Sequence, residues 1–490
     1  MKPNDGLLER WEAILAQKRD APAIFNSRGR VAFTFRGIDE RARDFESKIE
    51  SFDAGSVVAI QIGNHEDWPS ILIACLRRGV VVLPLEQSIS DQQRDAALKT
   101  CKAAGVVTAG GTYVMSSGVE TSLDISEIVR DSSAPLGMTK APMETSATKT
   151  RWGTNQPALL KLTSGTTAAP RAIRFRSDQL LADCDQICET MGISDVDLNF
   201  GVIPVSHSYG FSNLLTPLIA RGVAMVLSQD RTPRAVLNDL AKTDATVFPG
   251  MPVFYQAFCE MKDVPILPKL RLCISAGAPL PITVPKKFRE RFGLPIHSFY
   301  GASECGGICY DREAKNEIEG FVGSPMKDVA LEMIDPSAEA SQVRVRSAAV
   351  GDGYFPEPDE EKLGDAVFVP DDLLAHRGAG FKIVGRVSDV INVAGKKVNP
   401  AEIEEALLRF PGVRQAVAFG RPAGAGFRNE EVAACVVVDV GLRENEILEF
   451  CRNGLSAWQV PKRIFIVDSI PANERGKISR RELTRRFQQR

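Results

Sequence analysis

The sequence predicts an α/β protein with a large N-terminal domain of layered sheets and helices and a small α+β C-terminal domain. Three observations lead to this prediction. The chain has 490 residues, whereas single cores stop growing at roughly 250 to 300 residues. Apolar strand patterns alternate with helical patterns along most of the chain, which is typical of parallel sheets covered by helices. The pattern changes near residue 385, where a strand ends and charged residues intervene.

The first hundred residues show this alternation most clearly. A helical pattern over 36–49 precedes a buried strand pattern over 56–62, and a helical pattern over 70–79 precedes a strand pattern over 80–86. Such a succession predicts a parallel sheet covered by helices. Residues 131–150 are rich in Ser, Thr, Pro and Lys without periodicity, and they predict an exposed loop.

Apolar strand patterns recur between helical segments from 157 to 310, and they predict a second α/β layer. Strands then dominate to about residue 385. Asn399 and Pro400 favour a helix start, with Asn as cap and Pro in the first helical position. The expected helices of the last hundred residues are 401–410 and 444–454, and the expected strands are 416–420, 431–440 and 463–470. The predicted boundaries are an N-terminal domain at 1–385, a hinge at 386–389 and a C-terminal domain at 390–490.

The charge balance favours a small-molecule partner. The 60 Lys and Arg residues against 62 Asp and Glu residues give a net charge of -2, so no overall field attracts nucleic acid or an anionic membrane. The start of the chain lacks an apolar signal core, and no apolar run reaches the roughly 18 residues of a membrane span. We therefore expect a cytoplasmic protein with neither nucleic acid nor membrane as partner. The ten Cys residues include no CxxC pair and are expected to be reduced core residues.

The segment Thr163, Ser164, Gly165, Thr166 and Thr167 directly follows an apolar strand pattern, and basic residues come after it. Hydroxyls, turn N–H groups and cations together suit phosphate oxygens. The segment is not a Walker loop, because GxxxxGK[ST] is absent. A Ser- and Thr-rich surface turn explains this segment alone equally well.

Two further glycine turns strengthen the phosphate interpretation. Residues 275–280 and 298–307 each carry a strand pattern that runs into such a turn. In the second turn, Tyr300 offers an aromatic face for a base and Ser303 a hydroxyl for phosphate. Glu304 adds a carboxylate for Mg²⁺, which typically takes one or two carboxylates plus phosphates. These turns together favour nucleotide binding.

With these turns included, the chain resembles the adenylate-forming superfamily of acyl- and aryl-CoA synthetases, luciferases and peptide-synthetase adenylation domains. The likeness covers nearly the whole chain, because the matching motifs occur in order and at plausible spacing. The motifs are TSGTT at 163–167, PVSHSYG at 204–210, SAGAPL at 275–280, YGASE at 300–304, PDDL at 370–373, IVGRVSD at 383–389, INVAGKKVNPAEIEE at 391–405 and PANERGKISR at 471–480.

The resemblance implies an acid–thiol ligase that uses ATP and Mg²⁺. Such an enzyme joins a carboxylic acid to AMP with release of pyrophosphate. It then passes the acyl group to the thiol of CoA or of a carrier-protein phosphopantetheine. The implied catalytic residues are Lys477, Glu304, which also binds the metal, and Arg171. The implied nucleotide-binding residues are Thr163, Ser164, Gly165, Thr166, Thr167, Gly277, Tyr300, Gly301, Ser303, Asp372 and Arg386.

The resemblance also implies that the small C-terminal domain is mobile. In the family this domain rotates after the adenylate forms, which withdraws the catalytic lysine and brings another loop to the site. Arg386 and Asp389 match the hinge motif, and Gly395 with Lys396 matches the loop that serves the thiol step. A surface ion pair and solvated lysines are the simpler explanations of these residue types in isolation.

The expected substrate is an aryl acid of the hydroxybenzoate or cinnamate kind. Peptide-synthetase domains carry an Asp near the position of His207 to hold an amino group, and this chain has none there. Asn213 adds a hydrogen-bonding group for a ring hydroxyl. A medium- or long-chain fatty acid is the alternative, and the aromatic residues are equally compatible with ordinary core packing. The expected pocket residues are His207, Tyr209, Phe211, Phe248, Gly306 and Ile308.

Two other functional classes compete with this interpretation. Residues 301–305 fall one residue short of the GxSxG turn of α/β-hydrolases. The second competing class is a binding protein that has the adenylate-forming fold but has lost catalytic activity. It stays open because Ala168, Arg171 and Ala172 stand where the family has Gly, Lys and Gly. Arg keeps the positive charge but is not equivalent to Lys. The presence of Glu304, Asp372 and Lys477 favours an active enzyme.

Overall fold

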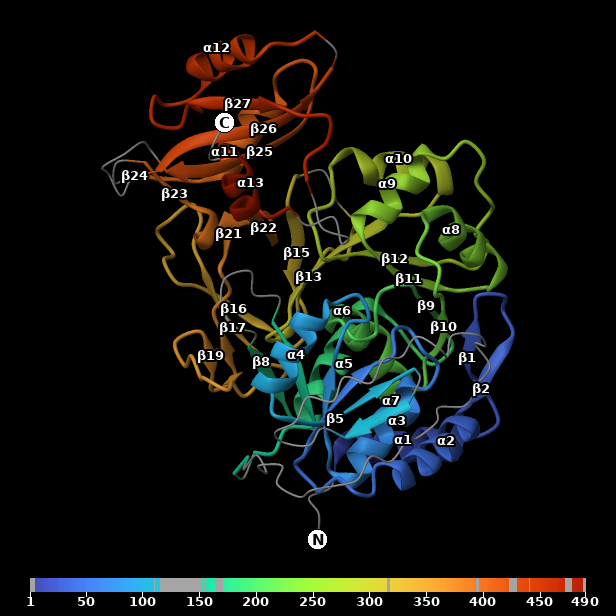
Figure 1. Ribbon diagram of the computed structural model, residues 1–490. Helices are drawn as coiled ribbons and strands as arrows, with labels where there is room; N and C mark the ends of the chain where they lie inside the picture. Colours follow the sequence, from blue (N-terminus) through green and yellow to red (C-terminus); the bar gives the residue numbers. More distant parts are fainter. Residues whose placement is uncertain are drawn as a thin grey trace. The chain divides into compact units, whose positions relative to one another are not determined.

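The chain forms two compact units in a computed structural model (Figure 1). The first contains residues 1–332 and 344–369, and the second contains residues 333–343 and 370–490. The structure describes residues 5–109, 111–114, 152–153, 155–163, 171–314, 318–393, 396–422, 430–439, 441–471 and 478–487.

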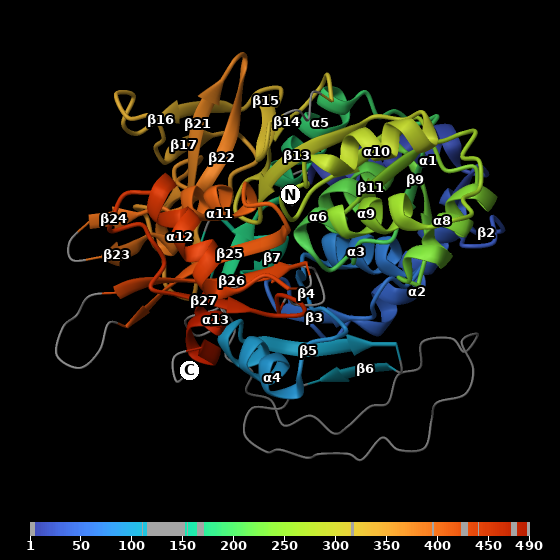
Figure 2. The ribbon, with the colours of Figure 1, turned by 90° about the horizontal axis from the view of Figure 1, so that it is seen from above.

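One sheet of the first unit has the strand order β18-β8-β7-β4-β3-β5-β6. Strand β3 lies between β4 and β5 and is parallel to both (Figure 2), whereas β7 and β8 form an antiparallel hairpin. One face of this sheet packs against helix α4 in an apolar cluster. The strands are β3 Val57–Gln61, β4 Val81–Pro84, β5 Ala103–Thr108, β6 Gly111–Val114, β7 Leu159–Leu162, β8 Ala172–Phe175 and β18 Tyr354–Phe355.

In a second sheet of the first unit, the strands lie in the order β2-β1-β10-β9-β11-β12-β13-β14-β15. The run from β1 to β13 is parallel, and β14 and β15 continue it as antiparallel strands. The strands are β1 Pro22–Asn26, β2 Val31–Thr34, β9 Leu198–Gly201, β10 Ala224–Leu227, β11 Val247–Gly250, β12 Leu272–Ser275, β13 Ile296–Ala302, β14 Gly306–Tyr310 and β15 Phe321–Pro325.

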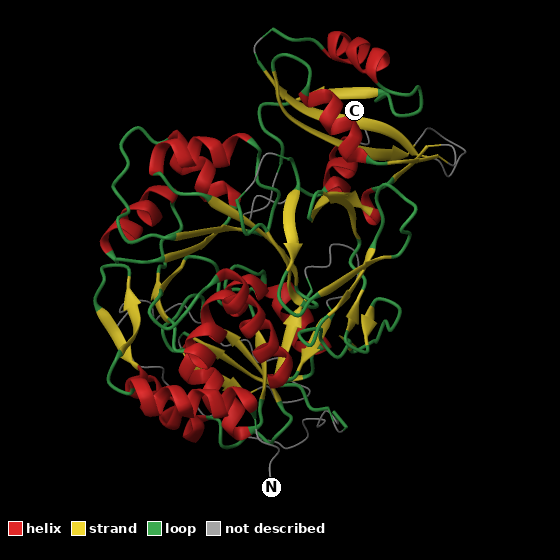
Figure 3. Cartoon of the chain, turned by 180° about the vertical axis from the view of Figure 1, so that it is seen from behind, coloured by secondary structure: helices red, strands yellow, loops and turns green. Residues whose placement is uncertain are grey.

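Helices flank both sheets of the first unit (Figure 3). Helix α5 contacts both β14 and the π-helical turn η1, and all three elements contribute residues to the wall of one cavity. The helices are α1 Gly6–Lys18, α2 Phe35–Lys48, α3 Trp68–Arg78, α4 Asp91–Thr100, α5 Ser177–Met191, α6 Ser208–Gly210, η1 Phe211–Leu215, α7 Thr216–Arg221, α8 Pro233–Lys242, α9 Pro252–Glu260 and α10 Thr283–Phe292. Short strands complete the region between residues 330 and 368: β16 Ala330–Met333, β17 Val343–Arg346, β19 Leu363–Gly364 and β20 Val367–Phe368.

The second unit contains a three-stranded sheet of order β25-β26-β27. Helices α11 and α12 pack on one face of it and α13 on the other, because successive side chains of β25 point to opposite faces. The elements are β21 Asp372–Arg377, β22 Gly380–Arg386, the 3₁₀ turn η2 Val387–Asp389, β23 Ile391–Val393, β24 Lys396–Val398, α11 Pro400–Leu408, β25 Val413–Pro422, β26 Glu430–Val438, α12 Glu444–Gly454, β27 Arg463–Ile466 and α13 Arg480–Phe487.

The α/β fold class with a large N-terminal and a smaller C-terminal part is confirmed. Residues 370–385 group with the second unit, because β21 and β22 form a hairpin and the Asn399 side chain donates to the Val384 carbonyl at 2.9 Å. The hinge at 386–389, which concerns motion, stays a prediction. The loop expected at 131–150 lies outside the described residues.

The cysteines agree with the expectation of reduced core residues. All ten are free thiols, and all except Cys259 are buried. Within the described ranges, the chain has no helix with the length and apolar character that a bilayer crossing requires.

Candidate active site

The predicted phosphate loop leaves and re-enters the fold at a hydrogen-bonded neck. Thr163 follows β7 and Arg171 precedes β8, and the two strands are antiparallel neighbours. The Thr163 N–H and hydroxyl both donate to the Arg171 carbonyl, at 2.9 and 3.2 Å. The predicted ligands Ser164, Gly165, Thr166 and Thr167 lie outside the described residues. The structure therefore fixes the two ends of this loop.

The second predicted turn joins β13 to β14. Tyr300 is buried at the end of β13. A Cβ added at Gly301 would lie 2.6 Å from the Gly306 carbonyl oxygen, so the close approach of the two strands requires glycine there. The Ser303 hydroxyl lies 3.0 Å from the Ser208 hydroxyl. This hydrogen bond joins the turn to the start of α6.

Glu304 is anchored through both its backbone and its side chain. Its carbonyl accepts from the Gly351 N–H at 2.9 Å, and its Oε1 accepts from the Tyr354 hydroxyl at 3.2 Å. Burial and the Glu304 charge raise the pKa of Tyr354, so the phenol remains a donor. A partly buried carboxylate in a fixed position suits Mg²⁺, which takes few protein ligands beside phosphates. No set of three or more His, Cys, Asp or Glu side chains in the described ranges forms a metal cage.

Arg171 lies over the ring of the same tyrosine. Its guanidinium carbon is 4.3 Å from the centroid of the Tyr354 ring, and its Nη1 is 3.8 Å from an oxygen of Asp359. Arg171 and Glu304, which lie in different predicted motifs, thus meet at one aromatic ring.

A cavity of about 100 Å³ lies beside these turns in the first unit. Its wall contains His207, Tyr209 and Gly306 of the predicted acid pocket and Gly277, Gly301 and Ser303 of the predicted nucleotide set. The two predicted groups therefore share one cavity. The full lining is Ile187, His207, Ser208, Tyr209, Ser212, Asn213, Ala276, Gly277, Phe299, Gly301, Ala302, Ser303, Gly306 and Gly307.

Two aromatic rings in the cavity wall face each other. The rings of Tyr209 and Phe299 are 5.8 Å apart and tilted by 42°. The Tyr209 hydroxyl donates to the Gly250 carbonyl at 3.3 Å, and burial raises its pKa well above the ordinary value. His207 caps α6, because its Nδ1 accepts from the Tyr209 N–H at 3.2 Å. The Asn213 amide donates to the Tyr209 carbonyl at 3.0 Å, and Asn213 Oδ1 accepts no hydrogen bond from the described residues.

Phe211, Phe248 and Ile308 do not line this cavity, in contrast to the prediction. All three are buried. The Phe248 ring packs among four other aromatic rings between 5.5 and 6.2 Å away, which explains its position in the core. The Phe211 ring lies 5.6 Å from the Lys161 ammonium. The direction of these side chains depends on tertiary packing that no local pattern specifies.

Several lining residues escaped sequence analysis. Phe299 directly precedes Tyr300 on β13. Because successive side chains of a strand point to opposite faces, the sequence could have suggested that Phe299 lies on the face opposite to Tyr300. Ile187 and Ser212 carry no such signal, because they belong to α5 and η1 and reach the cavity through helix packing. The π-helical turn η1 is itself of a kind that often occurs at functional sites.

A buried polar group supports the floor of the cavity. The Asp183 Oδ1 on α5 accepts from the Gly307 N–H at 3.0 Å. Lys161, at the end of β7, is 5% exposed, and its Nζ lies 4.6 Å from the Phe175 ring centroid. Burial lowers the pKa of Lys161, while Asp183 acts in the opposite direction. Sequence analysis missed both residues, because a single Lys in an apolar strand pattern gives no signal of its surroundings.

Three of the predicted residues of the second unit form ion pairs. Arg386 Nε donates to Asp372 Oδ1 at 2.7 Å. Asp389 pairs with Arg480 at 2.6 Å, and the same guanidinium pairs with Glu404 at 2.7 Å. Lys477 and Gly395 lie outside the described residues, as does the side chain of Lys396, although its backbone belongs to β24.

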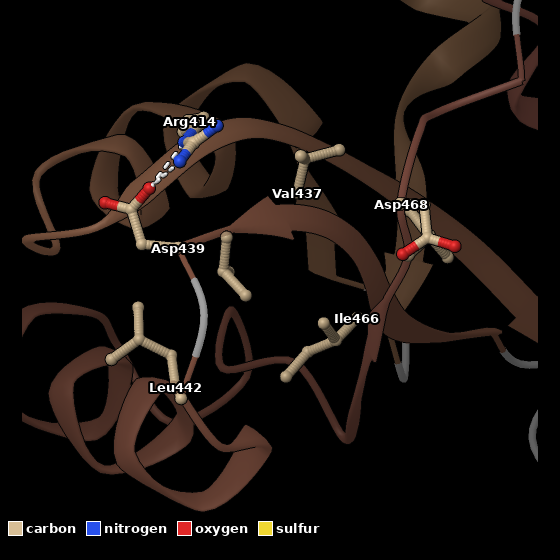
Figure 4. A pocket seen from close by; sticks show the side chains of 9 residues that line it. Arg414, Val437, Asp439, Leu442, Ile466 and Asp468 are labelled. Carbon is tan, nitrogen blue, oxygen red and sulfur yellow. Dashed lines mark hydrogen bonds and ion pairs between the residues drawn. The ribbon is translucent and has the colours of Figure 1, made fainter.

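Another cavity, of about 320 Å³, lies in the second unit between the ends of β26 and β27 (Figure 4). Arg414 and Asp439 in its wall pair with each other. None of the predicted site residues lines it, so it does not belong to the candidate active site.

Two protein-family domains match the chain. A family described as AMP-binding enzyme matches residues 11–355, and its C-terminal domain, described as AMP-binding enzyme C-terminal domain, matches residues 402–477. A probable CoA ligase from Humulus lupulus is 27% identical over 464 residues, which cover 88% of this chain and 87% of the relative. A feruloyl-CoA synthase from Amycolatopsis sp is 26% identical over 484 residues, 94% of this chain and 95% of the relative.

Solved structures are similar in fold over almost the full length. ATP-bound MatB from Rhodopseudomonas palustris has a TM-score of 0.81 at 20% identity and covers 99% of both chains. MenE, the o-succinylbenzoate CoA synthetase from Bacillus subtilis, was solved with ATP and magnesium. It has a TM-score of 0.77 at 21% identity and covers 98% of this chain and 99% of its own. At these identities the likeness concerns the fold.

Proposed function

Because this chain belongs to the AMP-binding enzyme family, we propose that it activates a carboxylic acid with ATP and transfers the acyl group to the thiol of CoA. The observation that carries this proposal is the shared cavity. Gly277, Gly301 and Ser303, assigned to the nucleotide, line the same space as His207 and Tyr209, assigned to the acid. Joining the two substrates requires their reacting atoms to be held side by side.

In the first proposed step, a carboxylate oxygen of the acid attacks the α-phosphorus of ATP, and the bond to pyrophosphate breaks. The loop that begins at Thr163 and the Ser303 hydroxyl hold phosphate oxygens. Glu304 holds Mg²⁺, which when bound neutralises charge on the phosphate oxygens. Lys477 bridges the carboxylate and the α-phosphate, where its charge stabilises the negative charge that grows on phosphorus. Asp372 holds the ribose hydroxyls.

In the second proposed step, the sulfur of the thiol attacks the carbonyl carbon of the acyl-adenylate, and AMP leaves. The hinge at 386–389 and the loop with Gly395 and Lys396 serve this step. CoA is favoured as the thiol, since several relatives carry CoA ligase or synthase names. A carrier-protein phosphopantetheine presents the same reactive arm and is the alternative acceptor.

The proposed acid is aromatic and carries a ring hydroxyl. A cavity of about 100 Å³ is of the order of one ring, given that an apolar cavity of about 150 Å³ holds benzene. Tyr209 and Phe299 offer ring contacts, and Asn213 Oδ1 offers an acceptor for the hydroxyl. Long-chain-fatty-acid–CoA ligases of Escherichia coli are also relatives, at 25% identity, but the cavity volume supports the shorter acid.

The hydrolase interpretation has less support. Among the described residues, the hydrogen-bond partner of the Ser303 hydroxyl is the Ser208 hydroxyl. A nucleophilic serine needs a general base at that distance, and a second hydroxyl does not supply one.

The test is acid-dependent exchange between pyrophosphate and ATP, measured with a panel of aryl, short-chain and long-chain acids. We expect hydroxybenzoate- and cinnamate-type acids to support exchange and long-chain acids to support less. Mass spectrometry after addition of CoA, or of a phosphopantetheinylated carrier, identifies the acyl acceptor. An absence of exchange with every acid of the panel would falsify the proposed activity and favour a binding role.

A further inference from the structure

Tyr354 lies between two residues of the proposed nucleotide site and belongs to neither of the motifs that contain them. Its hydroxyl is 3.2 Å from Glu304 Oε1, and its ring lies 4.3 Å from the guanidinium carbon of Arg171. The tyrosine is 5% exposed. A single buried side chain therefore joins the end of the phosphate loop to the carboxylate that is proposed to hold Mg²⁺.

The backbone around Tyr354 is held from two directions. Tyr354 pairs with Ile173 on β8, and the Arg174 N–H donates to the Gly353 carbonyl at 3.0 Å. On the other side, the Gly351 N–H donates to the Glu304 carbonyl at 2.9 Å. The phenol thus sits on a short strand that pairs with β8, and the residue three positions before it is bonded to Glu304.

The segment before Tyr354 is fixed from helix α5. The Gln179 amide donates to the Val350 carbonyl and to the Asp352 carboxylate, both at 2.8 Å. The Arg174 guanidinium also donates to the Asp352 carbonyl at 2.9 Å. These contacts leave the tyrosine ring little freedom to move away from Glu304.

We propose that Tyr354 is a positioning residue that orients the Glu304 carboxylate toward the cation that accompanies the nucleotide phosphates, with the Arg171 guanidinium holding the phenol ring by stacking. The proposal rests on the proposed function, in which Glu304 holds Mg²⁺. The hydrogen bond occupies one carboxylate oxygen and restricts the rotation of the group. A planar guanidinium stacks on an aromatic face, whereas an ammonium is a point charge. Arg171 therefore has a role here that a lysine would not fill.

The test compares ATP binding with and without Mg²⁺ by isothermal titration calorimetry on the full chain. Tyr354→Phe removes only the hydroxyl. We expect its affinity for ATP in Mg²⁺ to fall about tenfold, since a hydrogen bond to a charged group is of the stronger kind. Its affinity for ATP in EDTA should equal that of the wild type. The matched control is Tyr310→Phe, a buried tyrosine of β14 outside the proposed machinery.

Two further variants distinguish positioning from a general loss of structure. Arg171→Lys keeps the charge but loses the flat face, and should weaken binding in Mg²⁺ by a smaller factor than Tyr354→Phe. In a Glu304→Gln background, Tyr354→Phe should cause little additional loss of binding in Mg²⁺. Equal weakening with and without Mg²⁺ would overturn the positioning role, and so would an unchanged affinity of Tyr354→Phe in Mg²⁺.

The outcome separates this inference from the proposed function. If the wild type binds ATP equally with and without Mg²⁺ and shows no exchange, the proposed function fails and the positioning role fails with it. If the wild type shows Mg²⁺-dependent binding and exchange but Tyr354→Phe is unchanged, only the positioning role fails.

Discussion

Gly306 occupies a position where a methyl group has no space. A Cβ added there would lie 2.0 Å from Asp183 Oδ1, and the backbone adopts φ +69°. Glycine is therefore required for two reasons, one of conformation and one of contact. Since Asp183 also accepts from the Gly307 N–H, a side chain at Gly306 would displace the group that holds the cavity floor.

Gly306→Ala should lower the free energy of unfolding more than Gly293→Ala does. Gly293 has nearly the same conformation, φ +71°, but an added Cβ meets nothing within 4 Å. The control should lose about 1 kcal/mol from backbone strain, and Gly306→Ala about 1 to 3 kcal/mol more from overpacking. Urea denaturation measures both. Equal losses would show that Asp183 moves aside without cost.

Lys161→Met probes the buried ammonium beneath the site. Burial lowers the pKa of Lys161, so between its folded and unfolded pKa values the unfolded chain binds more protons. The stability of the wild type should therefore rise with pH up to about pH 10.4. The variant lacks this contribution, and its stability relative to the wild type should fall over the same range.

Urea denaturation at several pH values from 7 to 9.5 measures this difference. The exposed Lys99→Met is the reference for the same exchange on a surface helix. A stability difference between wild type and Lys161→Met that stays level or reverses with pH would contradict the assigned pKa direction.

A role for a single residue could be proposed from the sequence only where a motif carries it. Glu304 and Ser303 stand in one short motif, and their assignment needed no tertiary information. The link through Tyr354 could not be predicted, because 50 positions separate it from Glu304 and no local pattern records a contact across that distance. Phe248 lies outside the described cavity for a related reason, since its aromatic partners come from other elements.

At the scale of elements, strong apolar patterns located the strands and helices well. The helix expected at 36–49 is Phe35–Lys48, and the strand expected at 56–62 is Val57–Gln61. The strand expected at 463–470 ends at Ile466. Asp468 and Ser469 interrupt the apolar run there, and such residues favour turns. The sequence therefore predicts the existence of an element better than its ends.

Arg480 on α13 ties three elements of the second unit together. Its guanidinium pairs with Asp389 on η2 and Glu404 on α11 and donates to the Ala418 carbonyl on β25. Burial raises the pKa of Glu404, and Arg480 opposes that rise. The arginine thus favours the charged form of Glu404.

Arg480→Gln should destabilise the second unit, and more so at pH 8 than at pH 5. Without the guanidinium the pKa of Glu404 rises further, so the folded state binds more protons than the unfolded state above about pH 4.3. Folding stability then falls as pH rises through that window. Thermal unfolding at both pH values measures the effect. Arg409→Gln, which breaks an exposed pair with Glu405, should cost only a few tenths of a kcal/mol, and an equal loss in the two variants would refute the proposed role of Arg480.

At the scale of the whole molecule, the residues proposed for adenylation are distributed over both units. The shared cavity and Glu304 belong to the first unit, whereas Asp372 and Lys477 belong to the second. The first unit alone would therefore lack two of the proposed ligands. The predicted boundary at residue 385 placed Lys477 in the C-terminal domain and Asp372 in the N-terminal domain, whereas the structure groups both with the second unit.

Lys477→Ala should abolish most acid-dependent exchange between pyrophosphate and ATP. The expected loss is at least about 100-fold, since the lysine charge is proposed to act on the transition state. The exposed Lys462→Ala in the same unit is the matched control and should retain exchange. Substantial exchange by Lys477→Ala would remove this lysine from the proposed chemistry.

The neck between Thr163 and Arg171 also has an evolutionary consequence. The register of β7 and β8 is set by pairs such as Leu160 with Arg174 and Leu162 with Ala172, and the neck closes the intervening segment at its base. The cost of closing a loop changes slowly with its length. Residues 164–170 can therefore diverge, or be exchanged for the glycine-containing version of a relative, while the sheet retains its pairing. Natural selection could thus retune how the enzyme handles its nucleotide without rebuilding the domain.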